Sequence, residues 1–349
     1  MPASELKWSD EAVKRHTLEM LPMKRIVVLD GYTLNPLGVG VESKEHPSWE
    51  ALGRLGALRV HDRTASNQVA ERCAEAEIIL TNKVALNADV ISSLPKLEYI
   101  GVLATGTNIV DLDAAAVRGI PVTNVPGYST MTVAQHVIGL MYELLGYIGS
   151  NARAVREGDW VKCSDFCFTR APFHELSGKV FGLVGFGAIA QAVGRVAAAL
   201  GMRVLVHSRT QKASDFAVEW CSLRELLERA DIVSLHCPLT AETRELMNDE
   251  RLRWMRASAL LINTGRGPLV SEDAVARALV EGRLAGFGAD VLSLEPPKAD
   301  NPLLHAPRTV ITPHIAWASV EARKRLMATV VENVSAFLNG KIQNKVNML

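Results

Sequence analysis

The sequence predicts an α/β protein built from two doubly wound parallel-sheet domains. Its 349 residues correspond to about two domains at roughly 150 residues per domain. Short β-branched runs alternate with longer helical patterns, an order that produces parallel sheets covered by helices on both faces. Most of these runs are apolar throughout rather than alternating with polar residues, as expected for strands that are buried on both faces.

Ten apolar runs account for the strands. In the first part of the chain we expect them at 25–30, 77–82, 98–104 and 121–125, and in the second part at 179–185, 203–208, 231–237, 259–264, 285–291 and 309–313.

Two long helical patterns and two less regular segments complete the chain. Residues 132–150 predict a helix that joins the two sets of strands, and residues 319–340 predict an amphipathic helix closed by Gly340. Residues 151–176 show no clear period and predict irregular connecting structure. Residues 1–23 read as a weakly helical N-terminal extension that precedes the first strand.

The composition excludes several kinds of partner. The 38 basic residues balance the 38 acidic residues, so we expect neither nucleic acid nor a membrane as a partner. No apolar run approaches the roughly 18 residues of a membrane span, and the N-terminus lacks the apolar region of a signal peptide. The five cysteines are an odd number without framework spacing, which indicates a reduced, cytoplasmic setting.

A metal site is the one alternative that the cysteines raise. Cys163 and Cys167 lie close in sequence to His174, and these residue types bind zinc in other proteins. Their spacing favours ordinary thiols, so we expect no metal.

A glycine-rich turn opens the second set of strands. Residues 180–204 follow the order strand, Gly-x-Gly-x-x-Ala, helix, strand. Gly185 permits the tight turn, Gly187 lets the backbone approach a pyrophosphate, and Ala190 serves helix–strand packing. The free N–H groups at the start of the helix, around Ala188 and Ile189, then bind the phosphates. The pattern predicts a dinucleotide site for NAD(H) or NADP(H).

The end of the next strand bears on the choice of dinucleotide. An Asp or Glu usually stands there and binds the adenosine ribose of NAD(H), whereas this chain has Ser208, Arg209 and Thr210. A guanidinium and two hydroxyls can bind the 2′-phosphate of NADP(H), which we favour. In the alternative, Ser208 accepts a ribose hydroxyl of NAD(H) and Arg209 stacks on adenine.

Five further stretches occur in a characteristic order. They are GVLATGTNIVDLDAA at 101–115, LHCPLT at 235–240, NTGRGPLV at 263–270, GADVLSLEPP at 288–297 and TPHIAWAS at 312–319. Together with the glycine turn they resemble the D-isomer-specific 2-hydroxyacid dehydrogenases, a family that includes glycerate dehydrogenase and hydroxypyruvate/glyoxylate reductase. The resemblance spans nearly the whole chain from about residue 24.

The resemblance implies three catalytic residues. Arg266 holds the carboxylate and carbonyl of the substrate through its two-pronged guanidinium. His314 protonates the carbonyl oxygen as hydride arrives, and Glu295 pairs with the imidazole and favours its protonated form. These residue types suit the reaction, because hydride addition to a ketone places negative charge on the oxygen.

Other site residues are also implied by the resemblance. Asp290 accepts a hydrogen bond from the nicotinamide carboxamide, and the cofactor is lined by Cys237, Pro238 and Thr264. The backbone of Ala104, Thr105 and Gly106 binds the substrate carboxylate, and Trp317 walls the substrate pocket. Gln135 stands where the family usually has Glu, which puts one structural hydrogen bond in doubt.

The resemblance also implies an architecture and an activity. A Rossmann domain at 126–315 is inserted in a flavodoxin-like substrate domain made of 24–125 and 316–349, and the chain forms a homodimer. The activity is reduction of a small 2-oxoacid, of the hydroxypyruvate or glyoxylate kind, to the D-2-hydroxyacid with hydride from NAD(P)H. The alternative is a nucleotide-sensing co-regulator or binding module, since some members of the superfamily use this fold in transcriptional co-regulation.

Overall fold

The computed structural model describes residues 23–38 and 43–348. They form two compact units. The first unit comprises the described residues up to Tyr128 and those from Arg323, and the second comprises Ser129–Ala322. The extension predicted at residues 1–23 lies almost wholly outside the described residues. The finer boundaries predicted at 24–125, 126–315 and 316–349 remain a proposal.

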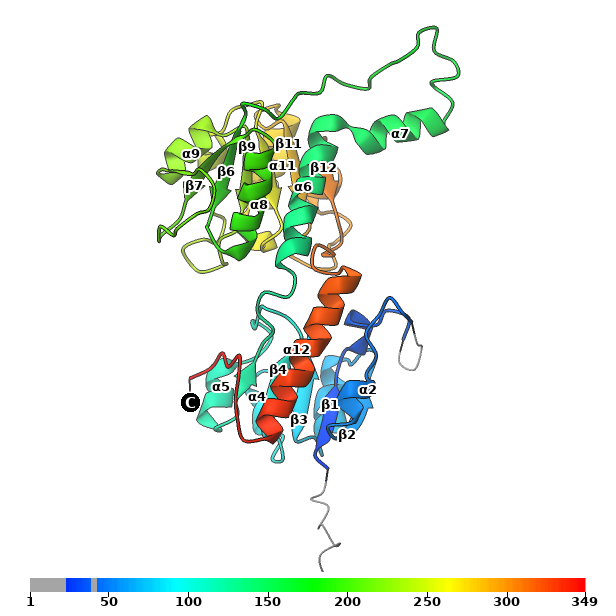
Figure 1. Cartoon of the computed structure of the whole chain (residues 1–349), viewed down its shortest axis with the longest axis vertical. Helices are drawn as coiled ribbons and strands as arrows, with labels where there is room; N and C mark the ends of the chain where they lie inside the picture. Colours follow the sequence, from blue (N-terminus) through cyan, green and yellow to red (C-terminus); the bar gives the residue numbers. More distant parts are fainter. Residues whose placement is uncertain (1–22, 39–42, 349) are drawn as a thin grey trace, which may run out of the picture. The chain divides into compact units, whose positions relative to one another are not determined.

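The first unit contains a five-stranded parallel sheet in the order β2-β1-β3-β4-β5 (Figure 1). Its strands are β1 (Arg25–Val28), β2 (Ala57–Val60), β3 (Ile78–Thr81), β4 (Tyr99–Val102) and β5 (Val122–Thr123). Its helices are α2 (Glu50–Gly53), α3 (Val69–Cys73), α4 (Ala88–Ser92), α5 (Leu112–Val117) and α12 (Val320–Leu338), with short 3-10 helices at Gly31–Thr33 and Ser66–Gln68. This strand order is that of flavodoxin-like folds.

Both faces of the first sheet are buried. On one face the strands pack with α3, α4 and α5 in one apolar cluster. On the other face, the Tyr99 ring of β4 stacks at 4.7 Å on Phe337 of α12. This two-sided burial explains why the central strands are apolar at every position rather than alternating.

The second unit contains a seven-stranded parallel sheet in the order β12-β11-β10-β9-β6-β7-β8. Its strands are β6 (Val180–Val184), β7 (Arg203–His207), β8 (Glu219–Trp220), β9 (Ile232–Leu235), β10 (Leu260–Asn263), β11 (Gly286–Ala289) and β12 (Thr309–Ile311). Its helices are α6 (Thr130–Gly146), α7 (Ile148–Arg156), α8 (Ala188–Ala199), α9 (Leu223–Arg229), α10 (Asp249–Leu252) and α11 (Glu272–Val280), with 3-10 helices η3 (Gly267–Leu269) and η4 (Pro302–Leu304).

Two apolar clusters lie on the two faces of the second sheet. Helices α6 and α8 contact one another and cover one face (Figure 1), and α9, α10 and α11 cover the other. The chain runs from β6 outward to β7 and β8, and then returns to place β9 on the opposite side of β6. The strand order therefore reverses between β6 and β9, and ligands of doubly wound sheets bind at the carboxyl ends of the strands at such a point.

The predicted fold class, two doubly wound parallel-sheet domains, is confirmed by these two sheets. All ten predicted strands are present, each with slightly narrower bounds. The structure adds β2 and β8, which the sequence analysis did not predict. The C-terminal helix is also present as α12, and Gly340 follows it with a left-handed φ of +71°.

The helix predicted at 132–150 is interrupted near its end. Helix α6 ends at Gly146, because Tyr147 adopts a left-handed backbone conformation with φ of 52°. A separate helix, α7, begins at Ile148 and continues to Arg156. The irregular segment predicted at 151–176 is therefore helical over its first six residues. No helix among the described residues is both long and apolar enough to cross a membrane.

Candidate active site

The glycine turn follows β6 at the reversal point of the second sheet. Gly185 has a φ of +94°, and its N–H donates to the His207 carbonyl at 2.7 Å. A Cβ on Gly185 would lie 2.7 Å from the His236 carbonyl carbon and 2.8 Å from the Cys237 nitrogen. Both the conformation and the space exclude any larger residue. The loops after β6, β7 and β9 thus meet at this glycine.

The neighbouring Gly187 faces open space. It has ordinary extended geometry, with φ of −79°, and a Cβ there would meet nothing within 4 Å. Helix α8 begins directly after it, without a side-chain cap and without an acidic residue in its first turn. The first N–H groups of α8, at Ala188 and Ile189, have no partner within the helix. An anion such as a pyrophosphate fits a helix start of this kind.

Two buried polar atoms beside the turn also lack partners. They are Nε2 of His236, which directly follows β9, and Oγ1 of Thr264, which directly follows β10. Buried polar groups almost always find a hydrogen-bond partner, so these two atoms are suited to a bound polar molecule. With Gly185 and Gly187 they fit a nicotinamide dinucleotide, which would supply the hydride. Burial lowers the pKa of His236 to about 4, so its imidazole is neutral at physiological pH.

The predicted ribose-binding residues follow β7. Ser208 is partly buried, while Arg209 and Thr210 are exposed. The Arg209 guanidinium lies 3.9 Å from the carboxylate of Glu242, and both side chains are 80% exposed. Such a pair contributes little to stability, so Arg209 can turn to a ligand phosphate at small cost.

His314 and Glu295 form a direct pair. Nδ1 of His314 lies 2.6 Å from Oε2 of Glu295, and the two side chains are 26% and 35% exposed. The second Glu295 oxygen, Oε1, accepts from the Leu292 N–H at 3.1 Å. Nε2 of His314 has no partner among the described residues, and it is the nitrogen that remains for a substrate oxygen. The pair therefore has the geometry of an oriented acid–base group.

Arg266 lies on a loop that packs against the segment leading to Glu295. It follows β10 and directly precedes η3, and its side chain is exposed. A Cβ on Gly267 would lie 2.0 Å from the Leu292 carbonyl carbon, so the two backbones touch there. Asn263, fully buried at the end of β10, donates to the Arg266 carbonyl at 2.8 Å. These contacts fix the loop. Nη1 of Arg266 donates to the Gly265 carbonyl at 2.8 Å, and the other N–H groups of the guanidinium remain for an anion.

The comparisons with known proteins agree with this geometry. A model of the D-isomer specific 2-hydroxyacid dehydrogenase NAD-binding domain matches residues 138–316. The hydroxypyruvate reductase of Blautia hydrogenotrophica is 42% identical over 328 residues, which cover 93% of this chain and 99% of that protein. The glycerate dehydrogenase of Methylorubrum extorquens is 43% identical over 281 residues, covering 80% of this chain and 88% of that one. The chain belongs to the D-isomer-specific 2-hydroxyacid dehydrogenase family.

Solved structures support the same assignment of the fold. A Thermus thermophilus protein superposes with a TM-score of 0.82 at 35% identity, covering 92% of this chain and 99% of that one. An NADPH-dependent glyoxylate/hydroxypyruvate reductase from Sinorhizobium meliloti, solved with NADP and malonate, superposes with a TM-score of 0.79 at 29% identity, covering 93% and 97%. The second unit of this 2-hydroxyacid dehydrogenase is therefore a Rossmann domain that binds a nicotinamide cofactor.

Asp290 has partners in this dehydrogenase that sequence reasoning missed. It is 1% exposed, and its carboxylate accepts from Thr312 Oγ1 at 2.6 Å and from the N–H groups of Ile315 and Ala316 at 2.9 and 2.7 Å. Asp290 thus holds the turn that carries His314. Its predicted bond to the nicotinamide carboxamide remains a prediction.

The remaining cofactor and pocket residues lie on the same edge of the second sheet. Cys237 and Pro238 follow β9, and burial raises the pKa of the Cys237 thiol, which therefore stays protonated. The indole of Trp317 donates to the His314 carbonyl at 3.0 Å. Trp317 is thereby tied to the His314 turn, and its predicted place in the substrate pocket remains a prediction.

The predicted carboxylate-binding loop belongs to the first unit. Ala104, Thr105 and Gly106 follow β4, where the Val125 N–H donates to the Ala104 carbonyl at 3.0 Å and Thr105 Oγ1 donates to the Val125 carbonyl at 2.8 Å. The Thr105 hydroxyl proton is thus engaged in holding the loop. Binding of the substrate carboxylate by the backbone N–H groups of this loop remains a prediction.

A buried carboxylate of the first unit was also missed. Asp30 follows β1, is 1% exposed, and accepts from the Asn82 and Val84 N–H groups, which follow β3, at 2.9 and 3.2 Å. Desolvation raises the pKa of Asp30, against the lowering effect of these N–H donors. The Asp30 carboxylate thereby joins the loop after β1 to the loop after β3, where the strand order of this sheet reverses.

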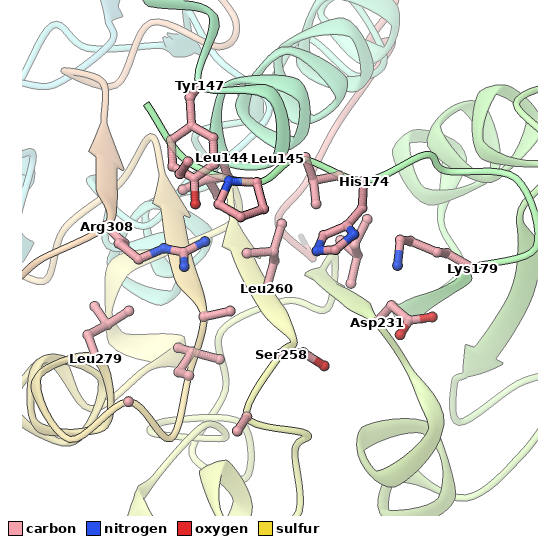
Figure 2. Close-up of a pocket in the computed structure, with 17 residues that line it drawn as sticks. Leu144, Leu145, Tyr147, His174, Lys179, Asp231, Ser258, Leu260, Leu279 and Arg308 are labelled. Carbon is pink, nitrogen blue, oxygen red and sulfur yellow. The ribbon is translucent and has the colours of Figure 1, made fainter. Parts of the chain in front are cut away.

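A cavity of about 580 Å³ lies at the opposite edge of the second sheet (Figure 2). Its polar lining includes Lys179, Asp231 and Arg308, which directly precede β6, β9 and β12, so it opens at the amino ends of the strands. Figure 2 shows Arg308 beside Tyr147 on one side, and His174 close to Lys179 on the other. None of the predicted catalytic, cofactor-binding or substrate-binding residues lines this cavity. Among the residues that the structure describes, no cluster of His, Cys, Asp or Glu could hold a metal ion.

Proposed function

We propose that this chain catalyses the NAD(P)H-dependent reduction of a small 2-oxoacid, of the hydroxypyruvate or glyoxylate kind, to the D-2-hydroxyacid. The observation that carries the proposal is the 2.6 Å pair between His314 and Glu295. It occupies the same sheet edge as the dinucleotide turn at Gly185. Relatives named hydroxypyruvate reductase, glycerate dehydrogenase and glyoxylate reductase support this substrate class.

Each catalytic residue has a distinct part in this reaction. Arg266 binds the substrate carboxylate and polarises the carbonyl, because its guanidinium is permanently charged and offers a planar fork of donors. His314 donates its Nε2 proton to the carbonyl oxygen as hydride reaches the carbon. Glu295 holds the imidazole by Nδ1, which directs Nε2 to the substrate and stabilises the imidazolium. In the opposite direction, His314 accepts the hydroxyl proton.

The lining of the cofactor follows the same edge. Gly185, Gly187 and the start of α8 bind the pyrophosphate, and Cys237, Pro238 and Thr264 line the nicotinamide half. The backbone of Ala104–Gly106 binds the carboxylate of the substrate. The names of the relatives lend no support to the alternative of a nucleotide-sensing co-regulator. A cytoplasmic location remains a prediction from the cysteine count.

We propose NADP(H) as the preferred cofactor. An acidic residue after β7 would repel a 2′-phosphate, whereas this chain offers a cation and two hydroxyls there, from Arg209, Ser208 and Thr210. The similar reductase from Sinorhizobium meliloti is NADPH-dependent. The test is the ratio of kcat/KM for NADPH and NADH. Arg209→Asp should lower that ratio by roughly 10- to 100-fold, because a charged hydrogen bond contributes about 1.5–3 kcal/mol. Arg244→Asp, at another exposed arginine, serves as the control. A wild-type preference for NADH would contradict this assignment.

We further propose that the chain forms a homodimer through the segment 148–173. Six large apolar side chains of that segment are exposed, and Val161 and Phe166 are about 90% exposed; the other four are Ile148, Val155, Trp160 and Phe173. Apolar groups gathered in this way mark an association surface. Light scattering should give a dimer for the wild type and a monomer for Val161→Ser with Phe166→Ser. Val117→Ser, at a similarly exposed valine, should leave the mass unchanged. A monomeric wild type would contradict the proposal.

A further inference from the structure

A histidine outside the predicted catalytic set contacts the turn that carries His314. His136 lies on α6, and its side chain is 22% exposed. Its Nε2 is 2.8 Å from Thr312 Oγ1 and 3.6 Å from Asp290 Oδ1. Thr312 Oγ1 is in turn 2.6 Å from Asp290 Oδ1. The three side chains form a continuous polar chain from the helix to the buried carboxylate.

The direction of the hydrogen bonds in this chain follows from the number of protons. An ionised carboxylate only accepts, and a threonine hydroxyl has one proton to donate. Thr312 gives that proton to Asp290 across the 2.6 Å contact. The 2.8 Å contact to Thr312 must therefore be a donation from Nε2–H of His136. The contacts thus select the tautomer of His136 that carries its proton on Nε2.

The chain ends on the group that shapes the catalytic turn. Asp290 receives every backbone N–H of residues 314–316: its carbonyl accepts from His314 at 2.9 Å, and its carboxylate accepts from Ile315 and Ala316. His314 itself has a left-handed φ of 54°, a conformation that a residue with a side chain holds only when its surroundings enforce it. The bonds to Asp290 supply that enforcement.

We propose that His136 is a positioning residue for the reaction: by donating to Thr312 it orients the Asp290 carboxylate and, through it, the turn that aims His314. His136 contacts neither of the predicted catalytic groups His314 and Glu295. It acts through Thr312 and Asp290. The inference rests on the proposed function for its effect on turnover, and on the structure alone for its effect on the His314 turn.

The kinetic test compares two substitutions at His136. His136→Phe keeps the ring and removes the donor, whereas His136→Gln keeps an N–H donor at similar reach. For hydroxypyruvate reduction with NADPH, kcat should fall about tenfold in the Phe variant, the effect of one lost hydrogen bond. The KM for hydroxypyruvate should change less than twofold, and the Gln variant should recover most of kcat. Gln135→Leu, at the exposed neighbouring position, is the control.

A double-mutant cycle tests the route of the effect. Thr312→Val removes the hydroxyl and keeps the side-chain shape. If His136 acts through Thr312, adding His136→Phe to Thr312→Val should cause little further loss of kcat, since coupled residues are not additive. Fully additive losses would overturn the proposed route, and so would a His136→Gln variant as slow as His136→Phe.

A measurement without turnover separates this inference from the proposed function. In the ¹⁵N-histidine NMR spectrum of the full chain, neutral His136 should show the Nε2–H tautomer. The ring signals of His314 should move in His136→Phe and stay in place in Gln135→Leu. The opposite tautomer, or unmoved His314 signals, would overturn the positioning role whatever the activity. If the spectra are as expected but the wild type reduces no 2-oxoacid, the positioning of the His314 turn is supported and only the proposed function is overturned.

Discussion

The two glycines of the nucleotide turn should fail in different ways when each is replaced by alanine. Gly185→Ala places a methyl group 2.7–2.8 Å from backbone atoms of His236 and Cys237, at a φ of +94°. The left-handed conformation costs about 1–2 kcal/mol, and overpacking costs about 1–3 kcal/mol. The free energy of unfolding of the apo protein should therefore fall by about 2–5 kcal/mol.

Gly187→Ala should leave the fold intact and weaken the binding of the cofactor. Its φ of −79° suits alanine and its Cβ would meet nothing within 4 Å, so the free energy of unfolding should stay within about 0.5 kcal/mol of wild type. The new methyl group would stand where the backbone must approach the pyrophosphate. An overpacking cost of about 1–3 kcal/mol corresponds to a Kd for NADPH raised by roughly 5- to 150-fold.

Urea unfolding and fluorescence titration with NADPH measure the two effects separately. Gly282→Ala is the matched control for backbone strain, because Gly282 has a φ of +67° and nothing within 4 Å of its Cβ. This substitution should lower the free energy of unfolding only by the cost of the left-handed conformation, about 1–2 kcal/mol. The reasoning is refuted if Gly185→Ala is no less stable than this control, or if Gly187→Ala binds NADPH as the wild type does.

Two further substitutions test other parts of the structure. Arg266→Lys should lower kcat/KM for hydroxypyruvate by roughly 10- to 100-fold, because an ammonium cannot reproduce the two-pronged contact with a carboxylate; an unchanged value would exclude Arg266 from the carboxylate site. The pKa of His236 is lowered to about 4 by burial, below its unfolded value of about 6.5. Between these values the unfolded chain binds more protons, so stability falls as the pH falls, by about 2 kcal/mol from pH 7.5 to 5 for this group. Urea unfolding of the apo protein at the two pH values should show a smaller loss for His236→Gln than for the wild type, and equal losses would contradict the assignment.

Features that depend on local pattern could be predicted from the sequence. The central strands are apolar throughout because both sheet faces are covered. The glycine turn was recognisable because an apolar strand precedes it and a helix follows it. The edge strand β2 was missed because it alternates between exposed and partly buried residues, with Arg59 within it. The break at Tyr147 was missed although Gly146 directly precedes it, because the residue that adopts the left-handed conformation is a tyrosine, which rarely does so.

Features that depend on long-range contacts could not be predicted. Sequence reasoning selected His314 and Glu295 through the family motifs, and the structure pairs them. It could not show that Asp290 takes the backbone N–H groups of the His314 turn, because those partners lie 22–26 positions further along the chain. His136 was missed for the same reason, since its partner Thr312 is 176 positions away.

The most direct test of the central claim is the reduction of hydroxypyruvate and glyoxylate by NADPH and NADH, measured for the wild type and His314→Ala, with the configuration of the hydroxypyruvate product determined. We expect turnover by the wild type and a D-configured product. In His314→Ala we expect kcat to fall by roughly 10²–10⁴, with the Kd for the cofactor unchanged. A wild type that turns over neither 2-oxoacid with either cofactor, or a His314→Ala variant as active as the wild type, would contradict the account.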